Sequence, residues 1–233
     1  MNLIEKFKQS RTKYGDCFFV DGTTCCGKSS LTEKFNSDKI NNYINIEYYN
    51  FFPRVSYDYL YGYDHLLRTS QAVSFDRSPI SNIAFLIIQQ YMNKAHLLDK
   101  LTPFGLINLI FLELDLFDLF GYIKGKKYPV VILIDSDVEQ LKRRLINRNA
   151  GKDYYYAQQT LYLNAQNHVY SYLAEILEYP LIEYSDLPAL KDILTPMTKE
   201  SIIGGNELIK KNEPWDKNTA MMILKQVTSL HKR

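Results

Sequence analysis

Short apolar runs alternate with amphipathic stretches along most of the chain. The runs are rich in aromatic or β-branched residues, as is typical of strands, and lie at 16–21, 43–47, 71–76, 128–135 and 180–185. Helical spacing of apolar residues occurs at 3–13, 28–35, 54–69, 78–95, 104–123, 137–149, 154–178 and 216–231. Pro79 falls near the start of one expected helix, where its missing N–H does little harm. This alternation predicts an α/β fold, a three-layer sandwich with a central parallel sheet of about five strands.

The composition indicates a single domain over residues 1–233. Hydrophobic residues make up 46% of the chain and charged residues 23%, which permits a sizeable core and argues against wholesale disorder. The net charge of +2 is too small to indicate a nucleic-acid polymer or a membrane surface as partner. The apolar runs are too short and too often interrupted by charge to span a bilayer.

Cysteine content and the first residues bear on the compartment. The three cysteines, Cys17, Cys25 and Cys26, form neither a disulfide framework nor a zinc-binding pattern. The first 16 residues contain no apolar segment of the kind found in secretory signals. We therefore expect an intracellular, cytoplasmic protein, with a nuclear location left open.

The most specific motif is the stretch GTTCCGKS at residues 22–29, which follows a predicted strand and precedes a predicted helix. Two glycines permit a tight turn whose N–H groups face phosphate oxygens, Lys28 can reach the β- and γ-phosphates, and Ser29 can ligate Mg²⁺. A chance glycine turn is the alternative, and the strand–turn–helix context argues against it. The predicted nucleotide-binding residues here are Gly22, Thr23, Thr24, Cys25, Cys26, Gly27, Lys28, Ser29 and Ser30.

Two further strand ends carry candidate chemistry, because ligands of open α/β sheets bind at the carboxyl ends of strands. Asp76 and Arg77 end one strand, where the carboxylate can lie near the metal and the guanidinium can clamp a phosphate. Glu47 ends another and can accept a proton from a hydroxyl, while Phe52 can stack on a base. Purely structural roles fit these residues equally well. Asp76 can cap a helix and Arg77 can lie on the surface, while Glu47 can be an exposed strand end and Phe52 a core residue.

A basic segment follows the strand at 128–135. It contains Arg143, Arg144 and Arg148, and the last two share a helix face because they are four residues apart. Two guanidinium groups on such a segment can close over a triphosphate and stabilise charge in a transition state. A solvated basic helix is the alternative.

In this order the motifs resemble the deoxynucleoside kinase family, which includes the herpesvirus-type thymidine kinases. The matching features are an acidic residue before the phosphate loop, a strand-end Glu with an aromatic residue five positions later, an Asp-Arg-Ser-Pro-Ile motif, an arginine-rich lid and the helix after it. These are Asp21 with residues 22–29, Glu47 with Phe52, residues 76–80, residues 130–153 and residues 156–173. The resemblance covers residues 16–185 as a core and leaves 186–233 as a C-terminal extension.

The resemblance implies a P-loop kinase fold and transfer of phosphate from ATP, with Mg²⁺, to a nucleoside 5′-hydroxyl, most simply that of thymidine. It implies Glu47 as the base, Lys28 and Arg77 as catalytic cations, Arg144 and Arg148 as lid arginines, and Asp153 as a sugar contact. Tyr61 is a polar candidate where the family has a base-reading glutamine. A homodimer is expected, with ATP and a nucleoside or nucleotide as ligands.

Three other hypotheses stay open. A thymidylate-kinase-type nucleoside monophosphate kinase shares the same motifs but needs no strong base. A nucleotide-binding protein with little catalysis is motivated by Cys25, which stands where the family loop carries glycine. Redox regulation through Cys25 and Cys26 is the third, because a helix N-terminus and Lys28 can lower the pKa of a thiol.

Overall fold

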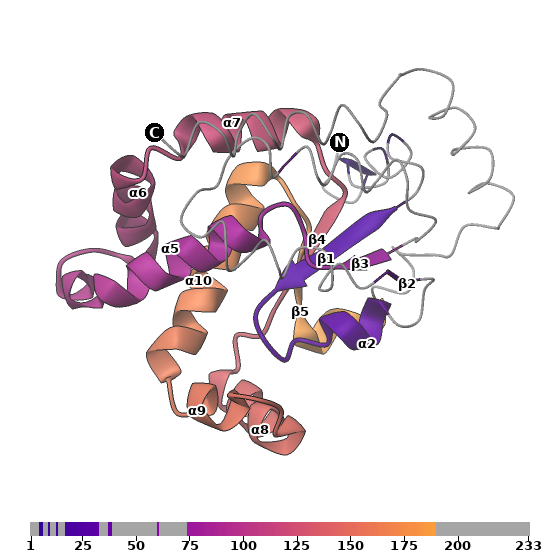
Figure 1. The fold of residues 1–233 in the computed structure, drawn as a ribbon, viewed down its shortest axis with the longest axis vertical. Helices are drawn as coiled ribbons and strands as arrows, with labels where there is room; N and C mark the ends of the chain where they lie inside the picture. The colour runs from indigo at the N-terminus through magenta and orange to yellow at the C-terminus, as the bar shows by residue number, and fades with distance from the viewer. Residues whose placement is uncertain are drawn as a thin grey trace, which may run out of the picture.

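The computed structural model describes most of the central part of the chain (Figure 1). The described residues are 17–32, 37–38, 60 and 74–189, together with Glu5, Lys6, Gln9 and Lys13. The strand predicted at 43–47 and the helix predicted at 216–231 lie outside them, as do all but a few residues of the helices predicted at 3–13 and 54–69.

The described strands form one parallel sheet in the order β2-β3-β1-β4-β5. Their bounds are β1 Phe18–Gly22, β2 Ser37–Asp38, β3 Ser74–Asp76, β4 Val130–Ile134 and β5 Leu181–Glu183. The predicted α/β class with a parallel sheet is confirmed, and four of the five predicted strands coincide with β1, β3, β4 and β5. The two-residue β2 is not among the predicted strands.

The strand order places a topological switch point between β1 and β4. The chain leaves β1 toward β2 and β3, but it leaves β4 toward β5, so the connections after these two neighbours run in opposite directions. Gly22 pairs with Leu133, so the carboxyl ends of both strands lie level. In open α/β sheets this is where ligands bind.

The helices begin and end close to the predicted positions, with two corrections. Their bounds are α2 Lys28–Thr32, α5 Ser81–Asn93, η1 Ala95–Asp99, α6 Pro103–Glu113, α7 Phe117–Lys126, α8 Val138–Arg148, α9 Asp153–Ala157, α10 Thr160–Leu177 and η2 Tyr184–Ala189.

The prediction of single helices at 104–123 and 154–178 was wrong, because each is broken into two. Asp115 adopts a left-handed conformation (φ +51°) between α6 and α7, and so ends α6. Gln158 and Gln159 separate α9 from α10. Pro79 lies directly before the N-cap residue Ile80, near the start of α5 as predicted.

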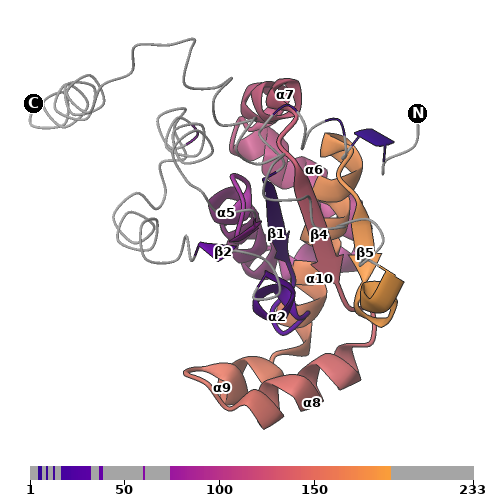
Figure 2. The same ribbon diagram turned by 90° about the vertical axis from the view of Figure 1, so that its right-hand side faces the viewer.

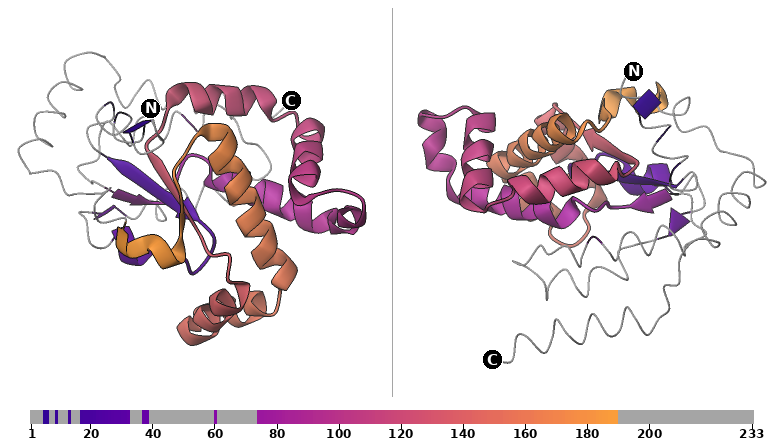
Figure 3. Two further views of the ribbon diagram at one scale, coloured as in Figure 1. Left: turned by 180° about the vertical axis from the view of Figure 1, so that it is seen from behind. Right: turned by 90° about the horizontal axis from the view of Figure 1, so that it is seen from above.

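Apolar clusters pack on both faces of the sheet, because successive strand residues point to opposite sides. Phe19 faces a cluster formed with α5, α6, α7 and α10, whereas Phe18 and Val20 face a second cluster formed with α8 and α9. Seen from behind, α10 lies beside the strands (Figure 3). Helices α8 and α9 lie at the end of the sheet toward which the strand arrows point, and α7 lies at the opposite end (Figure 2).

None of the helices in the described ranges is both long enough and apolar enough to cross a membrane.

The close approach of β1 and β4 gives a test of this register. A Cβ added to Gly22 would lie 1.8 Å from the Leu133 carbonyl oxygen, whereas a Cβ on Gly121 in α7 would meet nothing within 4 Å. We expect Gly22→Ala to lower the free energy of unfolding by at least about 3 kcal/mol. Gly121→Ala should raise it by about 0.5–1 kcal/mol, because alanine favours helix.

Urea unfolding of both variants measures the difference. Similar effects of the two substitutions would contradict the pairing of Gly22 with Leu133.

Candidate functional site

A buried carboxylate, that of Asp21, organises the carboxyl end of β1. Its Oδ1 accepts hydrogen bonds from the Gly22 N–H (2.8 Å) and the Tyr170 hydroxyl (2.9 Å). Its Oδ2 accepts from the hydroxyls of Ser78 (2.6 Å) and Ser81 (2.5 Å). Because these donors come from the turn after β1, the β3–α5 connection and α10, one side chain joins three segments distant in sequence.

Residues 22–29 form a turn, called the glycine turn below, with several left-handed backbone conformations. Gly22 has φ +129° and Gly27 has φ +76°, values that glycine adopts readily. The Thr23 N–H bonds to the Leu133 carbonyl at 2.9 Å, which anchors the turn to β4. Cys25 also has a positive φ, +56°. Cys25 therefore adopts the left-handed region that favours glycine, at some cost in backbone strain.

The backbone N–H groups from Cys25 to Ser30 have no hydrogen-bond acceptor within the described part of the chain. The ladder of α2 begins with the Leu31 N–H, which bonds to the Gly27 carbonyl at 2.9 Å. Consecutive N–H groups without acceptors, at the start of a helix, create a local preference for an anion. The glycine turn is thus suited to an anionic ligand.

Lys28 folds back onto the glycine turn. Its Nζ donates to the carbonyl oxygens of Gly22 (3.0 Å) and Thr23 (2.6 Å), and the side chain is buried. Burial, reinforced by the positive charge of Arg77, lowers the pKa of the Lys28 ammonium to about 8. Among the described residues Lys28 has no ion-pair partner, and an anion in the turn would provide one.

The two residues predicted to ligate metal lie together. The Ser29 hydroxyl donates to Asp76 Oδ2 at 2.5 Å, which joins the end of the glycine turn to the end of β3. No group of three or more His, Cys, Asp or Glu residues in the described ranges is arranged to hold a metal ion. A hydroxyl and a carboxylate oxygen suit Mg²⁺, which commonly takes one or two protein ligands and completes its shell with water and phosphate.

Arg77 is held in an unusual backbone conformation at the end of β3. Its φ is +108°, and its N–H bonds to the Val20 carbonyl at 2.9 Å. Its guanidinium lies 3.7 Å from Asp21 Oδ1, and 42% of the side chain remains exposed. Strained non-glycine conformations concentrate at functional sites. This backbone conformation places the partly exposed Arg77 guanidinium beside Asp21, at the start of the glycine turn.

Arg144 connects α8 to the glycine turn. Its Nε donates to the Cys25 carbonyl at 3.0 Å, and its Nη2 forms an ion pair with Asp135 at the end of β4. The guanidinium also lies 3.9 Å from the centre of the Tyr184 ring. The structure therefore brings this predicted nucleotide-binding arginine to the turn, where its donors contact protein groups.

Arg148 and Asp153 pair with each other. Arg148 donates from Nε and Nη2 to the two carboxylate oxygens of Asp153, each at 2.6 Å, and the Ala150 N–H adds a contact of 3.0 Å. The hydrogen bonds from Arg148 lower the pKa of Asp153 despite its burial. This bidentate pair joins the end of α8 to the start of α9. The two residues, each predicted to contact a ligand, therefore bind each other.

Sequence analysis missed the contribution of α10. The Thr24 N–H bonds to Gln166 Oε1 at 3.0 Å, and the Thr23 hydroxyl bonds to Asn167 Oδ1 at 2.6 Å. The amide of Asn167 also donates to the Asp135 carbonyl at 2.6 Å. The available signal was the polar pair Gln-Asn within an otherwise apolar helix face, followed four residues after Gln166 by Tyr170.

The expected lowering of the thiol pKa values was wrong. Burial raises the pKa of Cys25, and it raises the pKa of Cys26 to about 12. The positive charges of Arg148 near Cys25 and of Lys28 near Cys26 act in the opposite direction and are outweighed. Neither thiol therefore has the thiolate character that redox regulation requires.

Three predicted site residues, Glu47, Phe52 and Tyr61, lie outside the described residues. Their assignment as base and substrate contacts stays a prediction.

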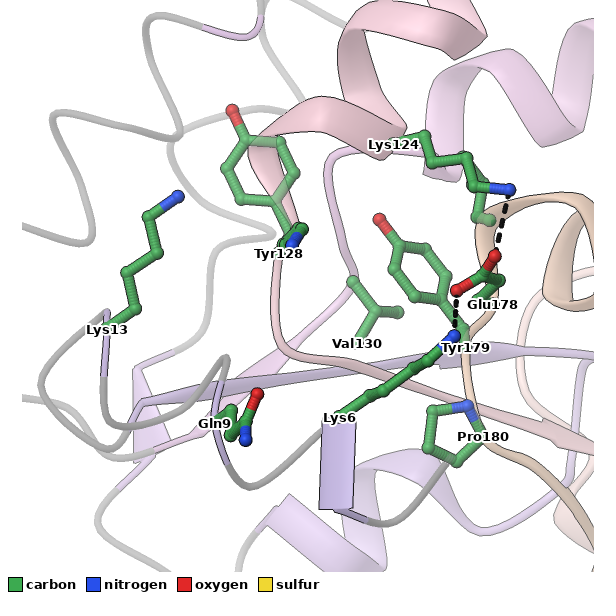
Figure 4. Close-up of a pocket in the computed structure, with 11 residues that line it drawn as sticks. Lys6, Gln9, Lys13, Lys124, Tyr128, Val130, Glu178, Tyr179 and Pro180 are labelled. Carbon is green, nitrogen blue, oxygen red and sulfur yellow. Dashed lines mark hydrogen bonds and ion pairs between the residues drawn. The ribbon is translucent and has the colours of Figure 1, made fainter. Parts of the chain in front are cut away.

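A separate cavity of about 360 Å³ lies at the opposite end of the sheet, beside the first residue of β4 (Figure 4). Lysines line much of it, and two of them, Lys6 and Lys124, form ion pairs with Glu178. Ligands of parallel sheets bind at the carboxyl ends of strands. We therefore place the candidate site at the glycine turn and not in this cavity.

Comparisons of the chain with protein-family models, with curated proteins and with solved structures found no match. Functional inference for this protein therefore rests on the chemistry and geometry of its own residues.

The buried lysine provides a test that is independent of activity. Between pH 8 and about 10.5 the unfolded chain binds a proton at Lys28 that the folded chain has lost, so stability rises with pH in this window. Relative to Lys28→Met, the wild type should gain up to about 3 kcal/mol between pH 7 and pH 10.5.

Denaturant unfolding of both proteins across this range measures the gain, and the difference between them cancels all other titrating groups. A constant difference would show that Lys28 is not buried as a cation.

Proposed function

We propose that this protein is a deoxynucleoside kinase that uses ATP and Mg²⁺ to phosphorylate the 5′-hydroxyl of a deoxynucleoside such as thymidine. The resemblance of its motifs to that family motivates the proposal. The proposal includes a P-loop kinase fold with an arginine-bearing lid. The strand order, with its switch point at the glycine turn, supports the proposed fold.

The contact between Ser29 and Asp76 carries the proposal. Sequence reasoning selected these residues separately, one from the loop motif and one from the Asp-Arg motif, as ligands of the same metal ion. They lie 47 positions apart in the chain, and their side chains meet at 2.5 Å beside a turn with unpaired N–H groups. A chance glycine turn gives no reason for a carboxylate at this point.

Both side chains fit a magnesium ion by the chemistry of their oxygen donors. Ser29 and Asp76 would hold it next to the glycine turn. When bound, the ion would neutralise charge on the β- and γ-phosphates.

The remaining residues supply binding and positive charge. The N–H groups of the glycine turn would donate to phosphate oxygens, and Lys28 would exchange its two carbonyl partners for a phosphate. The Arg77 guanidinium, next to Asp21, would contact the reacting oxygen. Arg144 is close enough to the turn to follow the phosphates. Because phosphoryl transfer depends mainly on positioning and charge, this set is sufficient in kind once Glu47 accepts the proton of the 5′-hydroxyl.

The acceptor is tested by measuring ADP release with each common deoxynucleoside and each deoxynucleoside monophosphate. We expect a deoxynucleoside, thymidine first, to stimulate turnover. Glu47→Gln should then lower kcat by about 10²–10⁴, because a hydroxyl acceptor needs a general base. Lys28→Met should lower it by about 10²–10³ through the loss of charge stabilisation.

Each alternative has its own outcome in the same assay. Stimulation by monophosphates with little effect of Glu47→Gln would identify a nucleoside monophosphate kinase. Nucleotide binding without stimulation by any acceptor would identify a nucleotide-binding protein with little catalysis.

The metal assignment is tested by titrating Mg²⁺ at fixed ATP. Asp76→Asn should raise the Mg²⁺ concentration needed for half-maximal activity by about 10-fold or more, because it removes a charged oxygen ligand. Asp99→Asn, an exposed carboxylate after α5, is the matched control and should have no effect. Equal titration curves for Asp76→Asn and the wild type would remove Asp76 from the metal site.

A further inference from the structure

The side chain of Gln166 contains a buried donor that no described residue satisfies. Only 5% of Gln166 is exposed, and its Nε2 has less than 1 Å² of accessible surface and no hydrogen-bond partner. Folded proteins leave few buried polar atoms in this state, because such an atom loses its water without a replacement. An unpaired amide beside a candidate ligand site therefore needs an explanation.

The orientation of this amide is fixed by the glycine turn. The Thr24 N–H lies 3.0 Å from Oε1 of Gln166 and needs an acceptor. Rotating the amide by 180° would place its NH₂ group against that N–H, donor against donor. Oε1 must therefore face Thr24, and Nε2 is left as the donor.

The neighbours of Gln166 show which ligand atoms this donor can meet. Tyr170, four residues later on the same face of α10, donates to the Asp21 carboxylate at 2.9 Å. Gln166 and Tyr170 thus lie on the face of α10 that meets Thr24 and Asp21.

The Gln166 side chain replaces a backbone donor. Because the Thr24 N–H donates to Gln166 Oε1, it cannot bind a ligand in the glycine turn, but the Gln166 Nε2 offers N–H groups in its place. A donor next to an anion-binding turn takes an acceptor oxygen, and it disfavours a group that can only donate.

We propose that Gln166 is a ligand-binding residue whose Nε2 donates to a phosphoryl oxygen of the nucleotide while its Oε1 holds Thr24. This inference rests on the proposed nucleotide binding, although it does not depend on catalysis. An ordered water that satisfies Nε2 is the competing explanation.

Two substitutions separate a direct contact from a role in holding Thr24. Gln166→Glu keeps an acceptor for the Thr24 N–H but replaces the donor with an anionic oxygen. Gln166→Met removes both functions at similar size. The matched controls are Gln89→Glu and Gln89→Met, which make the same changes at an exposed position of α5.

Binding of Mg·ATP and Mg·ADP is measured by calorimetry for the wild type and all four variants, with thermal unfolding as a check of folding. We expect Gln166→Met to weaken binding about 10- to 100-fold, as for loss of a hydrogen bond to a charged group. Gln166→Glu should weaken it at least as much, because it adds repulsion. The Gln89 variants should bind like the wild type.

Wild-type binding by Gln166→Glu together with weak binding by Gln166→Met would overturn the proposal in favour of a purely positioning role. Wild-type binding by both would overturn it in favour of the water. If folded wild-type protein binds neither nucleotide, this inference and the proposed function fail together. Tight binding without turnover defeats the kinase assignment alone.

The wild type offers a measurement that needs no variant to fold. The side-chain amide signals of Gln166 should shift in ¹H–¹⁵N spectra when Mg·ADP is added, and those of Gln89 should not. Unchanged Gln166 signals at saturating Mg·ADP would contradict a direct contact.

Discussion

The buried carboxylate of Asp21 is the constraint on which the candidate site depends. Taking an ionised group out of water is costly unless hydrogen bonds replace the lost solvation. Asp21 meets this requirement with a backbone N–H and three hydroxyls, from Ser78, Ser81 and Tyr170. Satisfying one charge therefore fixes the start of the glycine turn, the beginning of α5 and the middle of α10 relative to β1.

Several features around this carboxylate are unfavourable for folding by themselves. Cys25 and Arg77 occupy left-handed backbone conformations, and Lys28 is a buried cation whose direct partners are two carbonyl oxygens. Such features persist where the surrounding structure imposes them, and here Asp21 and the contacts to β4 do so. A buried cation without an ion-pair partner among the described residues is what an anionic ligand would stabilise.

The arginines of α8 illustrate how the protein manages charge around that turn. Arg144 contacts Asp135 and the Cys25 carbonyl, while Arg148 is neutralised by Asp153. Each cation is therefore paired within the described structure. Recruitment of either to a phosphate requires exchange of one anionic partner for another, which costs less than moving a bare cation out of water.

The sequence by itself determined the α/β class of the fold and the strand–turn–helix around residues 22–29, and it singled out Lys28, Ser29, Asp76 and Arg77 as the candidate site. These depend on local periodicity and on glycine spacing, both of which are visible without tertiary contacts. The meeting of Ser29 with Asp76 was expected because parallel strands end at one edge of the sheet. The pairing of Arg148 with Asp153 was not expected, because Arg148 had been predicted to contact phosphate and Asp153 to contact the sugar.

Tertiary structure alone decided the rest. The breaks at Asp115 and at Gln158–Gln159 arise where two apolar segments must turn to pack on one sheet, so the apolar pattern continues through them. The pKa values of Cys25 and Cys26 depend on burial, which outweighs the neighbouring charges that sequence reveals. Gln166 reaches Thr24 and Tyr170 reaches Asp21 from more than 130 positions away, because α10 packs against β1 and β4. No local pattern encodes such a contact, since its partners are brought together by the packing of the whole domain.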